Sequence, residues 1–89
     1  VPELLYIVQK PLSFFIDDKD ADAVVEVVRK AEAETGRPAR LVIADTLARM
    51  ASGADENHAK DMQPVILRFE RVAAETKSAV LIVHHAGKD

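Results

Sequence analysis

The stretch RLVIADTLARM, residues 40–50, decides the fold class, because a short apolar run ends there in an acid, Asp45. Two further apolar runs, Leu4–Val8 (LLYIV) and Ala79–Val83 (AVLIV), resemble Leu41–Ala44 in being rich in branched aliphatic residues. None of the three alternates with polar residues, which is typical of strands that are buried on both faces of a parallel sheet. We therefore predict strands over about 4–8, 41–45 and 79–84.

Helical periodicity separates the three strands. The first predicted helix, over about 20–34, has an apolar stripe made of Val24, Val27, Val28 and Ala31. The second, over about 58–76, carries a longer stripe: Ala59, Met62, Val65, Ile66, Phe69, Val72 and Ala73. Pro64 falls inside this pattern, and proline is tolerated only in a first turn or at a kink, so the main helix is expected to start near Asp61–Pro64.

The order strand–helix–strand–helix–strand predicts the α/β class. We expect a parallel β-sheet with flanking helices and right-handed crossovers, in one domain over residues 1–89.

The composition narrows the possible functions. The chain is 48% hydrophobic and 30% charged, as an ordinary folded domain is, and it has no cysteine, which excludes disulfides and thiolate metal sites. A net charge of −3 and few aromatic residues argue against nucleic-acid binding by this chain alone. A cytoplasmic origin fits the absence of cysteine, and the longest uncharged run, around residues 78–87, is too short to span a bilayer.

Polar side chains stand at two predicted strand ends, Asp45–Thr46 and His84–His85. In open α/β sheets ligands bind outside the carboxyl ends of the strands. From the residues alone, Asp45 is either an N-cap for Leu47–Met50 or a cation ligand, and the histidines are either hydrogen-bonded strand-exit residues or site residues. A zinc site made of Asp45, His84 and His85 is disfavoured, because adjacent residues on a strand point to opposite faces.

Four segments together resemble one family. LVIADTLARM (41–50), GADENHAKDM (53–62) and VLIVHHAGKD (80–89) look like the Walker B strand, its following loop and the sensor strand of RepA-like ATPases, and PLSFFIDDKDADAV (11–24) looks like the start of their preceding helix. These are RecA-like hexameric helicases of plasmids and phages, with relatives fused to primases. The resemblance implies a partial RecA-like P-loop NTPase core that works with ATP and magnesium, in a homo-oligomeric protein, a hexamer, of DNA replication or recombination.

The resemblance also implies a role for individual residues. Asp45 matches the acid that holds the magnesium of bound nucleotide, usually through water, and Thr46 matches the small hydroxyl residue after it. His85 matches the polar residue that senses the γ-phosphate, so Asp45 and His85 are the expected catalytic residues. His84 and Lys88 complete the expected nucleotide-binding set, with His84 pointing to the other side and no role assigned to Lys88.

The sequence departs from the family pattern in what it lacks. Neither a glycine-rich loop ending Gly-Lys-Ser/Thr nor the glutamate that activates water occurs in these residues, so the chain corresponds to the C-terminal part of the core without its Walker A segment. We expect the parent protein to be an ATPase or DNA helicase, and this chain alone neither to bind ATP tightly nor to hydrolyse it. We also expect Leu4–Val8 to pair with Leu41–Ala44, and in the parent protein we expect the strand before the phosphate loop to separate Leu41–Ala44 from Ala79–Val83. The isolated chain must then close this gap, fill it from a partner chain or leave edge groups unpaired.

The loop at 52–57 corresponds to a segment that faces DNA in RecA-like rings. It carries Asp55 and Glu56, which argue against direct contact with DNA phosphates, so DNA is expected to be a partner through the parent protein. Two other functions stay open: a non-catalytic α/β module for regulation or assembly, and the disfavoured metal-dependent hydrolase.

Overall fold

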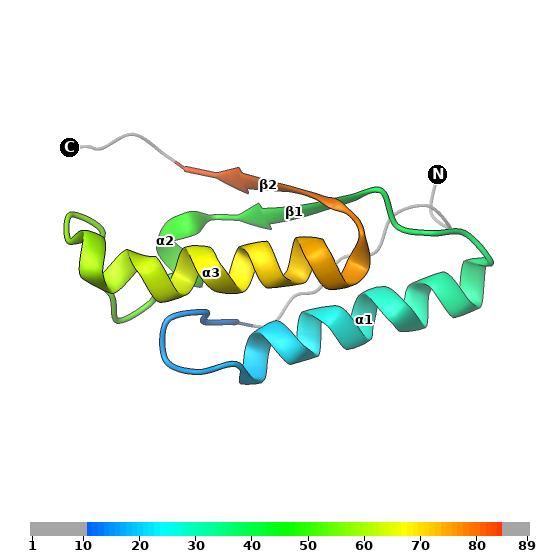
Figure 1. Cartoon of the computed structure of the whole chain (residues 1–89), viewed down its shortest axis with the longest axis horizontal. Helices are drawn as coiled ribbons and strands as arrows, with labels where there is room; N and C mark the ends of the chain where they lie inside the picture. The colour runs from blue at the N-terminus through cyan, green and yellow to red at the C-terminus, as the bar shows by residue number, and fades with distance from the viewer. Residues whose placement is uncertain (1–10, 85–89) are drawn as a thin grey trace.

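Two parallel strands lie over two long helices in the computed structural model, which describes residues 11–84 (Figure 1). The elements in chain order are α1 (Lys19–Thr35), β1 (Leu41–Asp45), α2 (Leu47–Met50), α3 (Ala59–Thr76) and β2 (Ala79–Val83). The predicted α/β class, with a parallel sheet and flanking helices, is confirmed. The strand predicted over about 4–8 lies outside the described residues.

The two strands pair directly. They are parallel and in register over five residues, from Leu41 beside Ala79 to Asp45 beside Val83. The backbone N–H of Ala79 also donates to the carbonyl of Arg40, 3.0 Å away. In this chain β2 therefore closes the gap expected beside β1, and the expectation that another strand separates the two strands concerns the parent protein and stays a prediction.

Helix α1 has the expected ends but buries a different stripe. Asp20 and Asp22 stand in its first turn, where the helix dipole favours negative charge, and Gly36 ends it at a positive φ of 69°, which glycine adopts readily. Its buried residues are Ala21, Val25 and Val28, so only Val28 of the predicted stripe is buried. The stripe differs because α1 packs against α3 along one side of the helix. Val24, Val27 and Ala31 lie next to that contact and are only half-buried.

Helix α3 spans the range predicted for it, about 58–76, and includes the turn before Pro64. It starts at Ala59 and contains Pro64, so the expectation of a start near Asp61–Pro64 is wrong. The turn before the proline is held by two bonds to the His58 carbonyl, from the N–H groups of Asp61 (3.0 Å) and Met62 (3.1 Å). Pro64 therefore removes one helical hydrogen bond without preventing the first turn from forming.

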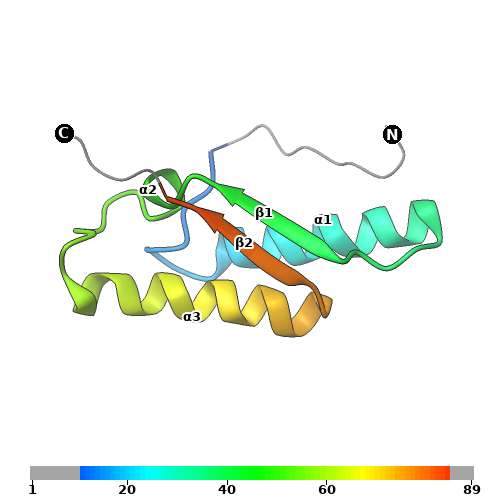
Figure 2. The same ribbon diagram turned by 90° about the horizontal axis from the view of Figure 1, so that it is seen from above.

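The core lies between the sheet and the two helices, which cover the same face of the sheet (Figures 1 and 2). Phe14, from the segment before α1, packs its ring against Phe69 of α3 with ring centroids 4.7 Å apart. Val65 and Val72, also on α3, are fully buried beside them, as the predicted α3 stripe requires. No helix within residues 11–84 has both the length and the apolar character needed to cross a bilayer.

The other face of the sheet is open within the described chain. Leu41, Ile43 and Leu81 are 52%, 56% and 52% exposed. The prediction that these strands are buried on both faces is therefore wrong for residues 11–84, because both long helices lie on one side.

Candidate functional site

The carboxyl edge of the sheet carries two of the expected site residues, Asp45 and His84. Because β1 and β2 are parallel, both strands end at this edge, and Asp45 stands beside Val83, the residue before His84. Asp45 and His84 come from segments that are far apart in the sequence. The structure thus places them at one edge, as the sequence predicted for the polar residues that end the strands.

Asp45 is not the cap of the helix that follows it. The N-cap of α2 is Thr46, whose hydroxyl oxygen accepts a hydrogen bond from the Arg49 backbone N–H at 3.4 Å. The Asp45–Thr46 peptide bond is cis. The carboxylate of Asp45 is exposed and has no hydrogen bond or ion pair with any residue in the described part of the chain. Of the two alternatives for Asp45, the cap is therefore wrong, and the cation ligand stays a prediction.

His84 contacts the loop that follows α2. Its Nε2 lies 3.6 Å from Oε1 of Glu56, and the His84 side chain is 60% exposed, so the pair is an ion pair only when the imidazole is protonated. Both residues stand out in the sequence, but their proximity does not, because it depends on the path of the 52–57 loop. His85 and Lys88 lie outside the described residues.

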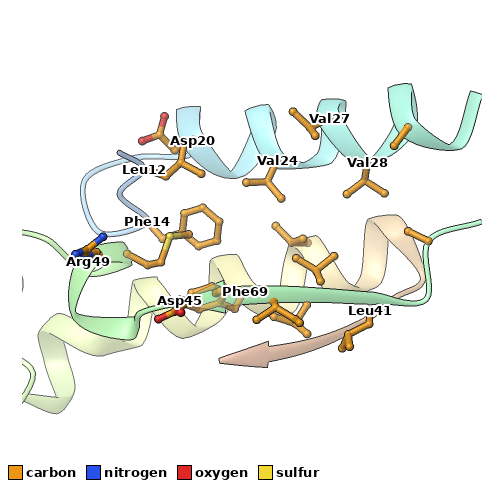
Figure 3. A pocket seen from close by; sticks show the side chains of 18 of the residues that line it. Leu12, Phe14, Asp20, Val24, Val27, Val28, Leu41, Asp45, Arg49 and Phe69 are labelled. Atoms are coloured by element: carbon orange, nitrogen blue, oxygen red, sulfur yellow. The ribbon is translucent and has the colours of Figure 1, made fainter. Parts of the chain in front are cut away.

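Arg49 lies near Asp45 in the structure, although no sequence motif singles it out. It belongs to α2 and lies at the same end of β1 as Asp45 (Figure 3). An exposed guanidinium there adds a fixed positive charge, the kind of group that pairs with phosphate oxygens. No motif marks this residue, because its place depends on the one-turn helix α2 folding back at the strand end.

Within residues 11–84 the carboxyl edge offers one free carboxylate, that of Asp45. A structural zinc site needs four protein ligands and a catalytic site three, and no group of three or more His, Asp or Glu side chains within residues 11–84 could hold a metal ion. Magnesium keeps several waters and takes one or two carboxylates, which a single free Asp45 can provide. The zinc combination with His85 involves a residue outside the described range.

The comparisons with known proteins give one match. A family model described as an AAA domain matches residues 2–89, nearly the whole chain. No curated protein and no solved structure matches the chain.

Proposed function

The chain belongs to the AAA domain family, an ATPase-type family, and on this premise we propose that it is the Walker B and sensor part of a RepA-like helicase or of a related DNA-replication or recombination ATPase. One observation supports the proposal most: the free carboxylate of Asp45 ends β1 next to the strand that leads into the two histidines. This is the edge at which open α/β sheets bind ligands.

In this proposal Asp45 holds magnesium through water at the β/γ-phosphate end of ATP. Magnesium supplies charge neutralisation in phosphoryl transfer. Thr46 keeps the turn after Asp45 in place by capping α2, and Arg49 offers a positive charge to the phosphates. His85 senses the γ-phosphate, while His84 and Lys88 belong to the same nucleotide-binding edge.

The proposed partners follow from the same family. The intact protein acts on DNA in the cytoplasm as a homo-oligomer, with a ring of six as the expected form. The loop after α2 presents Asp55 and Glu56 as exposed acids, so this segment itself does not supply the phosphate contacts to DNA.

The decisive experiment changes one charge in the intact protein that contains this chain. Asp45→Asn keeps the shape of the side chain and removes the charge that orients the metal. We expect ATP hydrolysis to fall by orders of magnitude and nucleotide binding to fall much less, measured by steady-state phosphate release and by titration with a fluorescent nucleotide. Glu26→Gln is the matched control, because Glu26 is an exposed acid on α1 and lies away from the carboxyl edge.

Two outcomes would contradict the proposal. A rate within a few-fold of wild type for Asp45→Asn would remove Asp45 from the site and favour the non-catalytic regulatory or assembly module. Magnesium-dependent ATP turnover by the isolated 89 residues would show that the site is complete here.

His85→Ala is expected to leave nucleotide binding nearly intact and to weaken the coupling between hydrolysis and DNA.

A further inference from the structure

The 52–57 loop meets the carboxyl end of β2 at the contact between Glu56 and His84. Nε2 of His84 lies 3.6 Å from Oε1 of Glu56, and no other carboxylate in the described part of the chain lies within ion-pair distance of this imidazole. His84 directly follows Val83, the residue that pairs with Asp45. The contact therefore lies at the same edge of the sheet as the proposed magnesium ligand.

Hydrogen bonds hold the backbone of the 52–57 loop on both sides of Glu56. The N–H of Asp55 donates to Oδ2 of Asp61 at 2.9 Å, and the N–H of Asn57 donates to Oδ1 of Asp55 at 3.0 Å. The apex of the loop is thus already ordered. Little further backbone entropy is lost when the Glu56 side chain makes a contact.

The start of the 52–57 loop is tied to the segment before α1. Oγ of Ser13 donates to the Ser52 carbonyl at 3.3 Å. Gly53 has a φ of 94°, which favours glycine, and a Cβ at this position would lie 3.4 Å from the ring of Phe15. The loop therefore links the segment before α1 to the end of β2, and Glu56 makes the contact at the β2 end.

The His84 imidazole can serve either the Glu56 carboxylate or a phosphate. Its contact with Glu56 is an attraction between charges when the imidazole is protonated, and a phosphate at this edge would use the same positive charge. The side chains of His84 and Glu56 are 60% and 36% exposed, and exposed charge pairs are weak. A bound phosphate can therefore displace Glu56 from His84.

We propose that Glu56 is an autoinhibitory residue: without nucleotide its carboxylate occupies His84, and the phosphates of a nucleoside triphosphate take its place and release the 52–57 loop. This inference rests on the proposed function, because it needs nucleotide phosphates at the carboxyl edge. Glu56 itself touches neither the nucleotide nor the metal. It lowers the affinity for nucleotide by keeping a positive group engaged.

The first test measures nucleotide affinity in the intact protein that contains this chain. Glu56→Gln keeps the size of the side chain and removes its charge. We expect the affinity for the magnesium complex of a fluorescent ATP analogue to rise by roughly two- to fivefold, as for the loss of one contact between exposed charges. Asp55→Asn is the matched control, because it removes an equal charge from the same loop and keeps the Oδ1 that accepts the Asn57 N–H. It should change the affinity much less.

A double substitution tests whether His84 carries the effect. In a His84→Ala background Glu56→Gln should no longer raise the affinity, because the group that Glu56 occupies is gone. The same titration with the fluorescent ATP analogue measures this. An equal rise with and without His84, an equal rise in Asp55→Asn, or an unchanged or lower affinity in Glu56→Gln would each overturn the inference.

The contact itself can be tested without nucleotide in the whole 89-residue chain. Glu56→Gln should shift the NMR resonances of the His84 imidazole, and Asp55→Asn should leave them nearly unchanged. Unshifted resonances in Glu56→Gln would overturn the inference and leave the proposed function in place. If the unmodified intact protein binds no nucleotide, the proposed function itself is overturned, and the inference with it.

Discussion

The two faces of the β1–β2 sheet differ in how much of their side-chain surface is exposed, although the same two strands form both faces. On the helix side Ala44 is 7% exposed and packs in the core, whereas its neighbour Ile43, on the other side, is 56% exposed. The helix side is filled by α1, α3 and the segment around Phe14. The open side has only solvent within the described chain, so an apolar sequence by itself does not guarantee burial.

This difference in exposure indicates which face of the sheet stabilises the fold and which face is suited to contacts outside the described chain. Side chains on the helix side contribute to folding because they leave water when the chain folds. Aliphatic side chains on the open side gain little from folding and are suited to contact with another part of a larger protein. Substitutions on the two sides should therefore have different effects, and the following three predictions test this, beginning with the largest effect.

Truncation of a core ring should be the most damaging change. Phe69 is 4% exposed and contacts Phe14, so Phe69→Ala should lower the free energy of unfolding by about 3–5 kcal/mol, measured by urea denaturation. Ile43→Ala is the control on the open side and should cost under about 1 kcal/mol. Equal losses would show that the open face is covered in solution and would break the comparison.

The segment that carries Phe14 is held on the helix side by Arg68. Its Nη1 donates to the carbonyls of Phe14 (2.8 Å) and Phe15 (3.0 Å), and its Nε donates to Oδ1 of Asp18 (2.9 Å). Arg68→Met keeps the apolar stem and removes these bonds, so it should cost about 1–3 kcal/mol in the same denaturation measurement.

Arg29→Met provides the comparison for this change. Arg29 lies 3.9 Å from Glu75 and is 59% exposed, so its loss should be nearly neutral. A neutral Arg68→Met would mean that the Phe14 segment does not depend on the guanidinium.

The smallest expected effect is a dependence of stability on acid. The hydrogen bond from Arg68 holds the pKa of the Asp18 carboxyl below its usual value against the opposing effect of desolvation, and the charges of Arg68 and Arg71 lower the pKa further. A pKa that is lower in the folded chain than in the unfolded chain favours folding above the unfolded value, about 3.9, and this contribution is lost as the pH falls through the folded pKa.

The urea midpoint of the unmodified chain should fall as the pH is lowered from 6 through the folded pKa of Asp18. In Asp18→Asn this fall should be smaller. An unchanged acid dependence in Asp18→Asn would show that other carboxyl groups cause it. Because Asp18 is exposed, salt should weaken the effect.

Residue patterns predicted the helices and strands themselves well, but they predicted less well which of them lie side by side. Apolar runs identified β1 and β2, and helical spacing identified α3 and its core residues Val65, Phe69 and Val72. The range of about 58–76 for α3 agrees with the structure, but the expectation that Pro64 delays the main helix to near Asp61–Pro64 is wrong, because the turn before Pro64 forms its own bonds to the His58 carbonyl.

The candidate site likewise has features that the sequence predicts and features that it does not. The position of Asp45 at a strand end could be predicted from the sequence, because it follows directly from where the apolar run stops. That Thr46 rather than Asp45 caps α2, that Arg49 lies nearby and that Glu56 approaches His84 could not be predicted. Each depends on the path of the backbone after the strand.

The sequence by itself determined the α/β class, the order of helices and strands, and the edge of the sheet on which the polar residues stand. These are local properties, since periodicity and chain direction are set by residues close together in the sequence. Only the tertiary structure decided that β2 lies directly beside β1, that α1 buries Val25 rather than Val24, and that one face of the sheet stays open. Those outcomes depend on which segments meet in space, and an apolar residue has the same hydrophobicity whichever neighbour covers it.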